Sequence, residues 1–162
     1  MKQSIHVSTE ITRYDDIEEL ENIDHIRLCK EAIRSTKHAY APYSNYQVGA
    51  GVLLEDGSIV IGNNQENAVY PLGLCAERVA IFSATSRFPA QRIAALAVYT
   101  LKTLAKKDLP PFPCGSCRQV ILEMEDRYQT DILVYVVGSD QSVCQIASAK
   151  DLLPLAFNQL SL

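Results

Sequence analysis

The chain has 162 residues, of which 48% are hydrophobic and 21% charged. This length and balance predict one compact domain over residues 1–162 that buries about two-thirds of its unfolded surface. The formal charge of -4 disfavours binding to a phosphate backbone, which requires a basic face, so we expect a small-molecule substrate and no nucleic-acid partner.

The N-terminal residues 1–16 lack the apolar core of a signal peptide, and no later run is long enough to cross a bilayer. We therefore expect a cytoplasmic protein with no membrane partner. Apolar residues recur with helical spacing between charged ones over residues 15–39, which predicts a long first helix.

The next segments predict a β-hairpin and then a helix and a strand. Residues 46–54 and 58–61 are apolar runs that flank Glu55-Asp56-Gly57, a strong signal for a tight turn between antiparallel strands. A polar loop follows over residues 63–73. Helical character resumes over residues 75–86, and the largely apolar residues 93–101 predict a strand.

The remaining third of the chain repeats the alternation of helix and strand. A loop rich in Lys and Pro, residues 102–113, precedes a predicted helix over residues 115–128 and a buried strand over residues 132–137. A short strand is expected over residues 143–146, and Ser148 can cap a last helical turn before Pro154. This order predicts a three-layer α/β domain with a mixed sheet of five strands.

Three of the five cysteines are candidate metal ligands. The odd count excludes complete pairing within one chain, and in a reducing compartment metal binding is favoured over disulfides. Cys114 and Cys117 open a helix three residues apart, so they share a face near amides that favour thiolates. Cys75 opens another helix and joins them if the two helix N-termini converge at one edge of the sheet.

Glu77, two residues after Cys75, is a candidate general base. Three thiolates hold zinc with its fourth position open to water, whereas a structural site closes that position with a fourth protein ligand. Glu77 can take a proton from such a water without being a ligand, which is the chemistry of hydrolytic deamination. Because three thiolates leave zinc with a net charge of about -1, we expect Arg78 to donate hydrogen bonds to the sulfurs; Arg118 is a weaker candidate.

Each of these features has a simpler interpretation. Taken alone, a Cys-x-x-Cys pair could be a redox pair or half of a structural zinc site, and Glu77 could be an ordinary first-turn residue. In a structural zinc module, Cys29 or Cys144 would be the fourth ligand.

Five blocks of sequence, in order, resemble the zinc-dependent cytidine deaminases, specifically the small homotetrameric type with three cysteine ligands. They are Tyr-Ser-Asn-Tyr-Gln-Val-Gly-Ala at residues 43–50, Asn-Gln-Glu-Asn-Ala at 64–68, Cys-Ala-Glu-Arg at 75–78, Pro-Cys-Gly-Ser-Cys-Arg-Gln at 113–119, and Leu-Leu-Pro-Leu-Ala-Phe at 152–157. The N-terminal extension, to about residue 23, and the Lys102-Lys106-Lys107 loop depart from the commonest pattern.

The resemblance implies a role for individual residues around the nucleoside. Asn64 and Glu66 should bind the ribose 3'-hydroxyl, and Tyr46, usually Phe in the family, should pack near the nucleoside. The Ala76 amide and the Cys114 carbonyl should contact the pyrimidine edge. Three further residues should act across a subunit boundary: Ala68 and Tyr70 at the 5'-hydroxyl of a neighbour's substrate, and the C-terminal Phe157.

The implied protein is a homotetrameric enzyme with the cytidine deaminase fold, one Zn²⁺ per subunit and active sites shared between subunits. It would convert free cytidine and deoxycytidine to uridine and deoxyuridine in pyrimidine salvage. A deaminase of the same fold acting on a cytosine-containing antibiotic or another amino-heterocycle is the alternative, because a pocket can change while the catalytic residues stay. Asn64 and Glu66 address a hydroxyl that both sugars carry, so they do not predict a preference between them.

Overall fold

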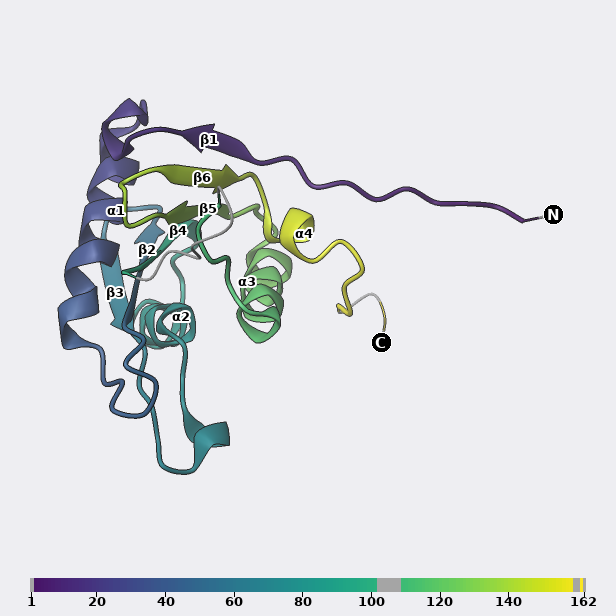
Figure 1. Ribbon diagram of the computed structural model, residues 1–162. Coiled ribbons are helices and arrows are strands. Elements are labelled where there is room, and N and C mark those ends of the chain that lie inside the picture. The colour runs from purple at the N-terminus through teal and green to yellow at the C-terminus, as the bar shows by residue number, and fades with distance from the viewer. Residues whose placement is uncertain (1, 102–108, 159–160, 162) are drawn as a thin grey trace.

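The computed structural model describes residues 2–101, 109–158 and 161, and its elements follow the predicted order (Figure 1). The helices are α1 (Ile23–Ser35), α2 (Ala76–Arg87), α3 (Gly115–Tyr128) and α4 (Ala149–Leu152). The strands are β1 (Thr12–Tyr14), β2 (Val48–Leu54), β3 (Ile59–Asn63), β4 (Ile93–Thr100), β5 (Leu133–Val137) and β6 (Val143–Ile146). They form one sheet in the order β1-β6-β5-β4-β2-β3, in which β4 and β5 are parallel and the other pairs antiparallel.

Helices cover both faces of this mixed sheet, so the three-layer prediction is confirmed. Figure 1 shows α1 on one side of the sheet and α2 and α3 on the other. Side chains alternate along β4 because successive residues of a strand point to opposite faces. Leu96 and Val98 join the core under α2 and α3, whereas Ala97 and Tyr99 join the core under α1.

The prediction of five strands is wrong, because the N-terminal segment adds a sixth. Strand β1 pairs antiparallel with β6 at the edge of the sheet, where Thr12 lies opposite Gln145 and Tyr14 opposite Val143. Its three residues show no apolar run, and two of them are exposed. These residues form a strand because they pair with β6 at the edge of the sheet, not because of a hydrophobic pattern in their own sequence.

The first helix is shorter than predicted. Residues 15–22 precede α1 and contain a 3₁₀ turn, Ile17–Glu19, and a second 3₁₀ turn, Thr36–His38, follows the helix. The Asp16 side chain accepts a hydrogen bond from the Glu18 amide at 2.9 Å, and Asn22 accepts one from the Asp24 amide at 2.8 Å. These short polar side chains cap the backbone and start new turns, which breaks a segment whose apolar spacing alone favours one helix.

A close approach between β3 and α2 sets the position of the second helix. A Cβ atom on Gly62 would lie 2.4 Å from the Ala80 amide nitrogen and 2.6 Å from the Ala76 carbonyl oxygen. Only glycine allows the two backbones to come this near. The first turn of α2, which follows Cys75, is therefore packed directly on the sheet.

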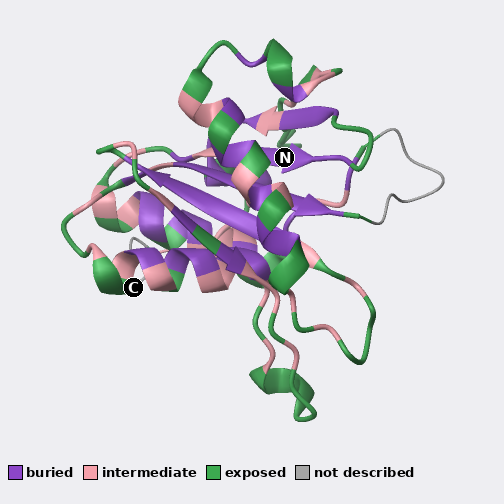
Figure 2. Ribbon diagram, turned by 90° about the vertical axis from the view of Figure 1, so that its left-hand side faces the viewer, coloured by how far each residue is buried: buried purple, intermediate pink, exposed green. Residues whose placement is uncertain are grey.

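The connection between β3 and α2 is the most exposed part of the central region. Residues 64–74 extend away from the body of the domain (Figure 1), and Figure 2 shows most of this loop exposed while the strands are buried. Most of the predicted Lys-rich loop, residues 102–108, lies outside the described residues. Within the described part of the chain, no helix has the length and apolar character to cross a membrane.

Candidate metal centre and active-site cavity

The three predicted ligand cysteines come together at the N-termini of α2 and α3. Cys75 is the N-cap residue of α2, Cys114 is the N-cap residue of α3, and Cys117 lies in the first turn of α3. The three sulfur atoms all lie within 4.8 Å of one another. The convergence expected for the two helix N-termini is therefore present.

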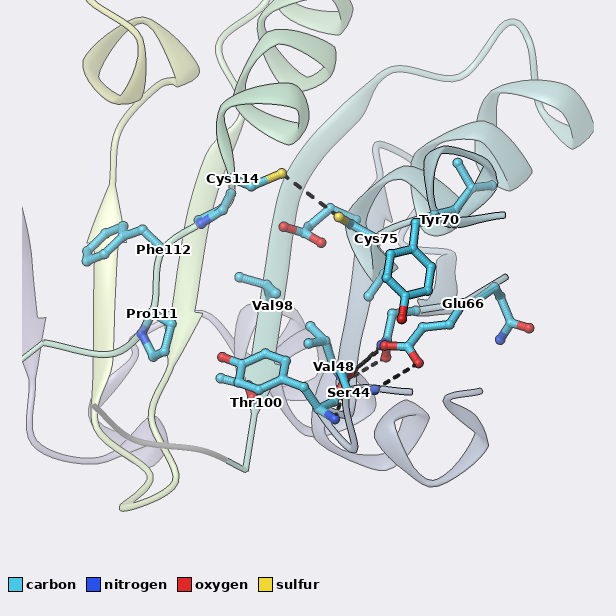
Figure 3. Close-up of a pocket in the computed structure, with 18 residues that line it drawn as sticks. Ser44, Val48, Glu66, Tyr70, Cys75, Val98, Thr100, Pro111, Phe112 and Cys114 are labelled. Carbon is cyan, nitrogen blue, oxygen red and sulfur yellow. Dashed lines mark hydrogen bonds between the residues drawn. The ribbon is translucent and has the colours of Figure 1, made fainter. Parts of the chain in front are cut away.

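The spacing and chemistry of these sulfurs fit a zinc ion. Cys75 Sγ lies 3.9 Å from Cys114 Sγ, and Cys114 Sγ lies 3.6 Å from Cys117 Sγ (Figure 3 shows the first pair). A tetrahedral ion with zinc–sulfur bonds of about 2.3 Å holds its sulfurs about 3.8 Å apart. Three thiolates also match the preference of zinc for soft ligands.

No fourth cysteine closes the site among the described residues. Cys29 is a buried residue of α1 and Cys144 a buried residue of β6, and neither belongs to the cluster of three. Burial raises the pKa of Cys29 to about 12, which disfavours the thiolate that a metal requires. The prediction that one of them could complete a structural zinc site therefore has no support in the geometry.

Arg78 provides positive charge beside the sulfurs. Its Nη2 atom lies 3.7 Å from Cys75 Sγ and donates a hydrogen bond to the Gly73 carbonyl at 3.3 Å. Its Nε atom is buried and has no hydrogen-bond partner in the described part of the chain. Hydrogen bonding with Cys117, assisted by Arg78, outweighs burial and lowers the pKa of Cys75 to about 5. The surroundings therefore favour a thiolate at Cys75.

Glu77 is a buried carboxyl group next to the cysteines. Only 4% of its surface is exposed, and burial raises its pKa above the ordinary value for glutamate. A raised pKa suits a group that must both accept and release a proton near neutral pH. Its place in the first turn of α2, two residues after Cys75, aims it at the same cavity as the thiols.

A cavity of about 460 Å³ lies in front of these residues. Figure 3 shows Cys75 and Cys114 on one side, Pro111 and Phe112 at one end and Glu66 at the other. The lining comprises Ser44, Tyr46, Val48, Asn64, Gln65, Glu66, Tyr70, Gly73, Leu74, Cys75, Ala76, Glu77, Val98, Thr100, Pro111, Phe112, Pro113 and Cys114. Most predicted substrate-binding residues are thus gathered around one space.

The two residues expected to bind the sugar are held in different ways. Asn64 Oδ1 accepts a hydrogen bond from the Val48 amide at 2.9 Å, and its Nδ2 atom donates to the Tyr46 carbonyl at 2.9 Å. Asn64 therefore also fixes the entry to β2, with one amide hydrogen left for another partner. Glu66 instead contacts the turn at Tyr43 and Ser44.

The other predicted substrate contacts are less uniform in their placement. Ala76 and Cys114 line the cavity, although the Cys114 carbonyl already accepts the Arg118 amide at 3.0 Å and has one lone pair left. Tyr70 lines the cavity but is 72% exposed. Ala68 and Phe157 are exposed and lie outside the lining, so any contact they make with substrate would have to be in a neighbouring subunit.

Residues 22–130 match the model of the cytidine and deoxycytidylate deaminase zinc-binding region. A cytidine deaminase from Halalkalibacterium halodurans is 43% identical over 135 residues, which are 83% of this chain and 95% of that protein. The chain belongs to the cytidine deaminase family.

Solved structures of cytidine deaminases share this fold. The enzyme from Burkholderia pseudomallei is 40% identical, with a TM-score of 0.69 over 82% of this chain and 98% of that one. The enzyme from Mycobacterium tuberculosis is 33% identical, with a TM-score of 0.64 over 85% of this chain and 99% of that one. The zinc-binding region of the family includes all three clustered cysteines of this chain.

The structure also adds residues to this cytidine deaminase cavity that the sequence did not single out. Phe112 and Val98 supply apolar walls, and Ser44 lies beside Glu66. Arg118 lies away from the thiols, because its guanidinium donates to the carbonyls of Pro113 at 2.8 Å and Leu152 at 3.0 Å. It ties the segment before Cys114 to the C-terminal segment, a role that spacing alone does not reveal.

Proposed function

We propose that this chain catalyses the hydrolytic deamination of free cytidine and deoxycytidine to uridine and deoxyuridine, with release of ammonia. One observation carries the proposal: the buried Glu77 carboxyl group lines a single cavity together with Cys75 and Cys114, and Cys117 completes the zinc-competent cluster of thiols. A space of about 460 Å³ lies within the range of small-ligand sites in proteins.

The proposed mechanism assigns the metal to Cys75, Cys114 and Cys117. A zinc ion held there supplies Lewis-acid chemistry, which makes hydroxide available as a nucleophile near neutral pH. Glu77 accepts the proton released from water and donates it to N3 of the cytosine ring as C4 is attacked. Glu77 then moves the proton of the hydroxyl added at C4 to the amino group, which leaves as ammonia while the C4 carbonyl of uridine forms.

The charges of the cavity favour a nucleoside over a nucleotide. Among the described residues that line it, Glu66 and Glu77 are acidic and none is Lys, Arg or His. A 5'-phosphate would have no cation to pair with there and would approach Glu66, so we expect cytidine to be a far better substrate than deoxycytidylate. Lys102, Lys106 and Lys107 lie outside the described residues.

The test is ultraviolet monitoring of purified, zinc-loaded protein with cytidine, deoxycytidine and deoxycytidylate. We expect turnover of both nucleosides and little turnover of the nucleotide. Glu77→Gln preserves shape but not the acid–base group, and should lower kcat by about 10²- to 10⁴-fold. Wild-type protein that releases no ammonia from either nucleoside, with one zinc bound per chain, would refute the proposal.

We further propose that the active protein is a cytoplasmic homotetramer with shared active sites. Large apolar side chains stand exposed near the cavity and on the C-terminal segment, among them Val69, Tyr70, Leu72, Leu155 and Phe157, whose exposed fractions range from 57% to 85%. Exposed apolar groups of this kind mark interaction surfaces. Light scattering should give the mass of four chains, and a fully active monomer would rule this assembly out.

A further inference from the structure

We propose that Ser44 is a positioning residue for substrate binding: its hydroxyl holds the Glu66 carboxylate ready to accept a hydrogen bond from the sugar of the nucleoside. The inference rests on the proposed function, because it assigns Ser44 a role in the same cavity. Ser44 and Glu66 both line that cavity, at the end away from Phe112 (Figure 3).

The Glu66 carboxylate is held by three donors from one turn. Its Oε2 atom accepts the Tyr43 amide at 2.9 Å and the Ser44 amide at 3.3 Å. Its Oε1 atom accepts the Ser44 hydroxyl. Two bonds therefore come from the backbone and do not depend on the side chain at position 44, whereas the bond to Oε1 depends on it entirely.

The direction of the hydroxyl proton follows from the rest of the turn. The Tyr46 amide donates a hydrogen bond to Ser44 Oγ at 3.0 Å, so that oxygen is already an acceptor and its single hydrogen is directed to Glu66. Asn45, between them, has a φ of 53°, and its amide bonds to the Ala41 carbonyl at 3.0 Å. This tight turn fixes the hydroxyl in place.

The contact also determines what Glu66 can recognise. The hydrogen bond from Ser44, with those from the Tyr43 and Ser44 amides, keeps the pKa of Glu66 below its usual value despite the opposing effect of burial. An ionised carboxylate only accepts hydrogen bonds, so its partner on the substrate must be a donor such as a sugar hydroxyl. Oε1 retains a lone pair for that partner, and Ser44 sets the direction of Oε1.

The segment that precedes this turn is hydrogen-bonded to the backbone of residues 64–66. The Tyr40 amide bonds to the Asn64 carbonyl at 2.9 Å, and the Glu66 amide bonds to the Tyr40 carbonyl at 2.9 Å. These backbone bonds hold the loop when the Ser44 hydroxyl is removed. Loss of the hydroxyl should therefore loosen one carboxylate oxygen without unfolding the loop.

The experiment measures kcat and KM for cytidine and for 3'-deoxycytidine, which lacks the relevant hydroxyl. Ser44→Ala should raise KM for cytidine by about three- to tenfold with kcat within about twofold, the pattern of lost ground-state binding. KM for 3'-deoxycytidine should be the same for Ser44→Ala and wild type. Ser44→Thr keeps the hydroxyl and should have the wild-type KM. The matched control is Ser86→Ala, because Ser86 is an exposed residue of α2 outside the cavity.

A second comparison keeps the test independent of general loop damage. In a Glu66→Gln background, Ser44→Ala should cause little further change in KM, because two residues that act through one contact are not additive. An unchanged KM in Ser44→Ala, or an equal rise for both substrates, would overturn the role of Ser44 while leaving deamination intact. Wild-type protein that turns over neither nucleoside would instead refute the proposed function, and the role of Ser44 with it.

Discussion

Replacing Gly62 with alanine should disrupt the metal centre from a distance, although Gly62 is not a ligand. Gly62 lies on β3, directly against the first turn of α2. An added Cβ atom would meet the Ala80 amide nitrogen at 2.4 Å and the Ala76 carbonyl oxygen at 2.6 Å. Both contacts are backbone atoms, so no side chain can rotate away to relieve them.

The geometry sets the size of the effect. Both contacts are roughly 1 Å shorter than an ordinary van der Waals contact, so α2 must move away from β3 by a distance of that order. Zinc sites tolerate errors of only about 0.2 Å in ligand distance. Because Cys75 caps α2 while Cys114 and Cys117 belong to α3, a shift of α2 alone separates one ligand from the other two. We expect zinc affinity and kcat/KM to fall by about 10²-fold or more.

The assay is competition for zinc between the protein and a chromophoric chelator, followed by thermal melting of the metal-free protein. Gly115→Ala is a matched control, because Gly115 lies beside the ligands on α3 yet a Cβ atom there would meet nothing within 4 Å. It should bind zinc as the wild type does. If Gly62→Ala also bound zinc and melted like wild type, β3 and α2 would not be rigidly packed and the reasoning would fail.

Three other changes probe the fold and the metal. Glu125→Ala should lower the free energy of unfolding, measured in urea, by about 3 to 5 kcal/mol. The Glu125 side chain is only 2% exposed and accepts hydrogen bonds from the amides of Ile132 and Ala149, both at 2.8 Å. Its removal leaves these buried amides without a partner. Burial lowers the pKa of His25 below 6.5, so at acidic pH the unfolded chain binds more protons than the folded chain. The free energy of unfolding, and with it Tm, should therefore fall as the pH drops below 6.5. His25→Phe should make Tm depend less on pH in this range. Removing zinc with a chelator should lower Tm, and added zinc should restore it.

The metal centre was predictable because its signals are local. A Cys-x-x-Cys pair at a helix start, and a Cys followed by Glu and Arg at another, already show which groups lie within one helical turn. What the sequence could not show was the environment of each group. The contact of Arg78 with Cys75, and the different partners of Arg118, depend on how α2, α3 and the C-terminal segment pack together.

The N-terminal region shows the opposite case. The apolar spacing over residues 15–39 predicts a continuous helix, but Asp16 and Asn22 cap shorter segments instead. Strand β1 has no apolar signal of its own and exists because β6 offers an unpaired edge. Ser44 is similar, since its partner Glu66 is 22 residues away and the contact is made by a turn. Features made by tertiary pairing leave little trace in a single sequence.

Strand direction explains why the two helix N-termini meet at all. Strands β3 and β4 both run antiparallel to β2, so they run parallel to each other. Their C-terminal ends therefore lie on the same side of the sheet. The chain leaves β3 toward α2 and leaves β4 toward α3, which brings Cys75 and Cys114 to that side of the sheet from the two strands that flank β2. Cys29 and Cys144 are buried in the cores on opposite faces of the sheet, so neither is placed to become a fourth ligand. The topology therefore offers a zinc ion three thiols and, among the described residues, no fourth cysteine.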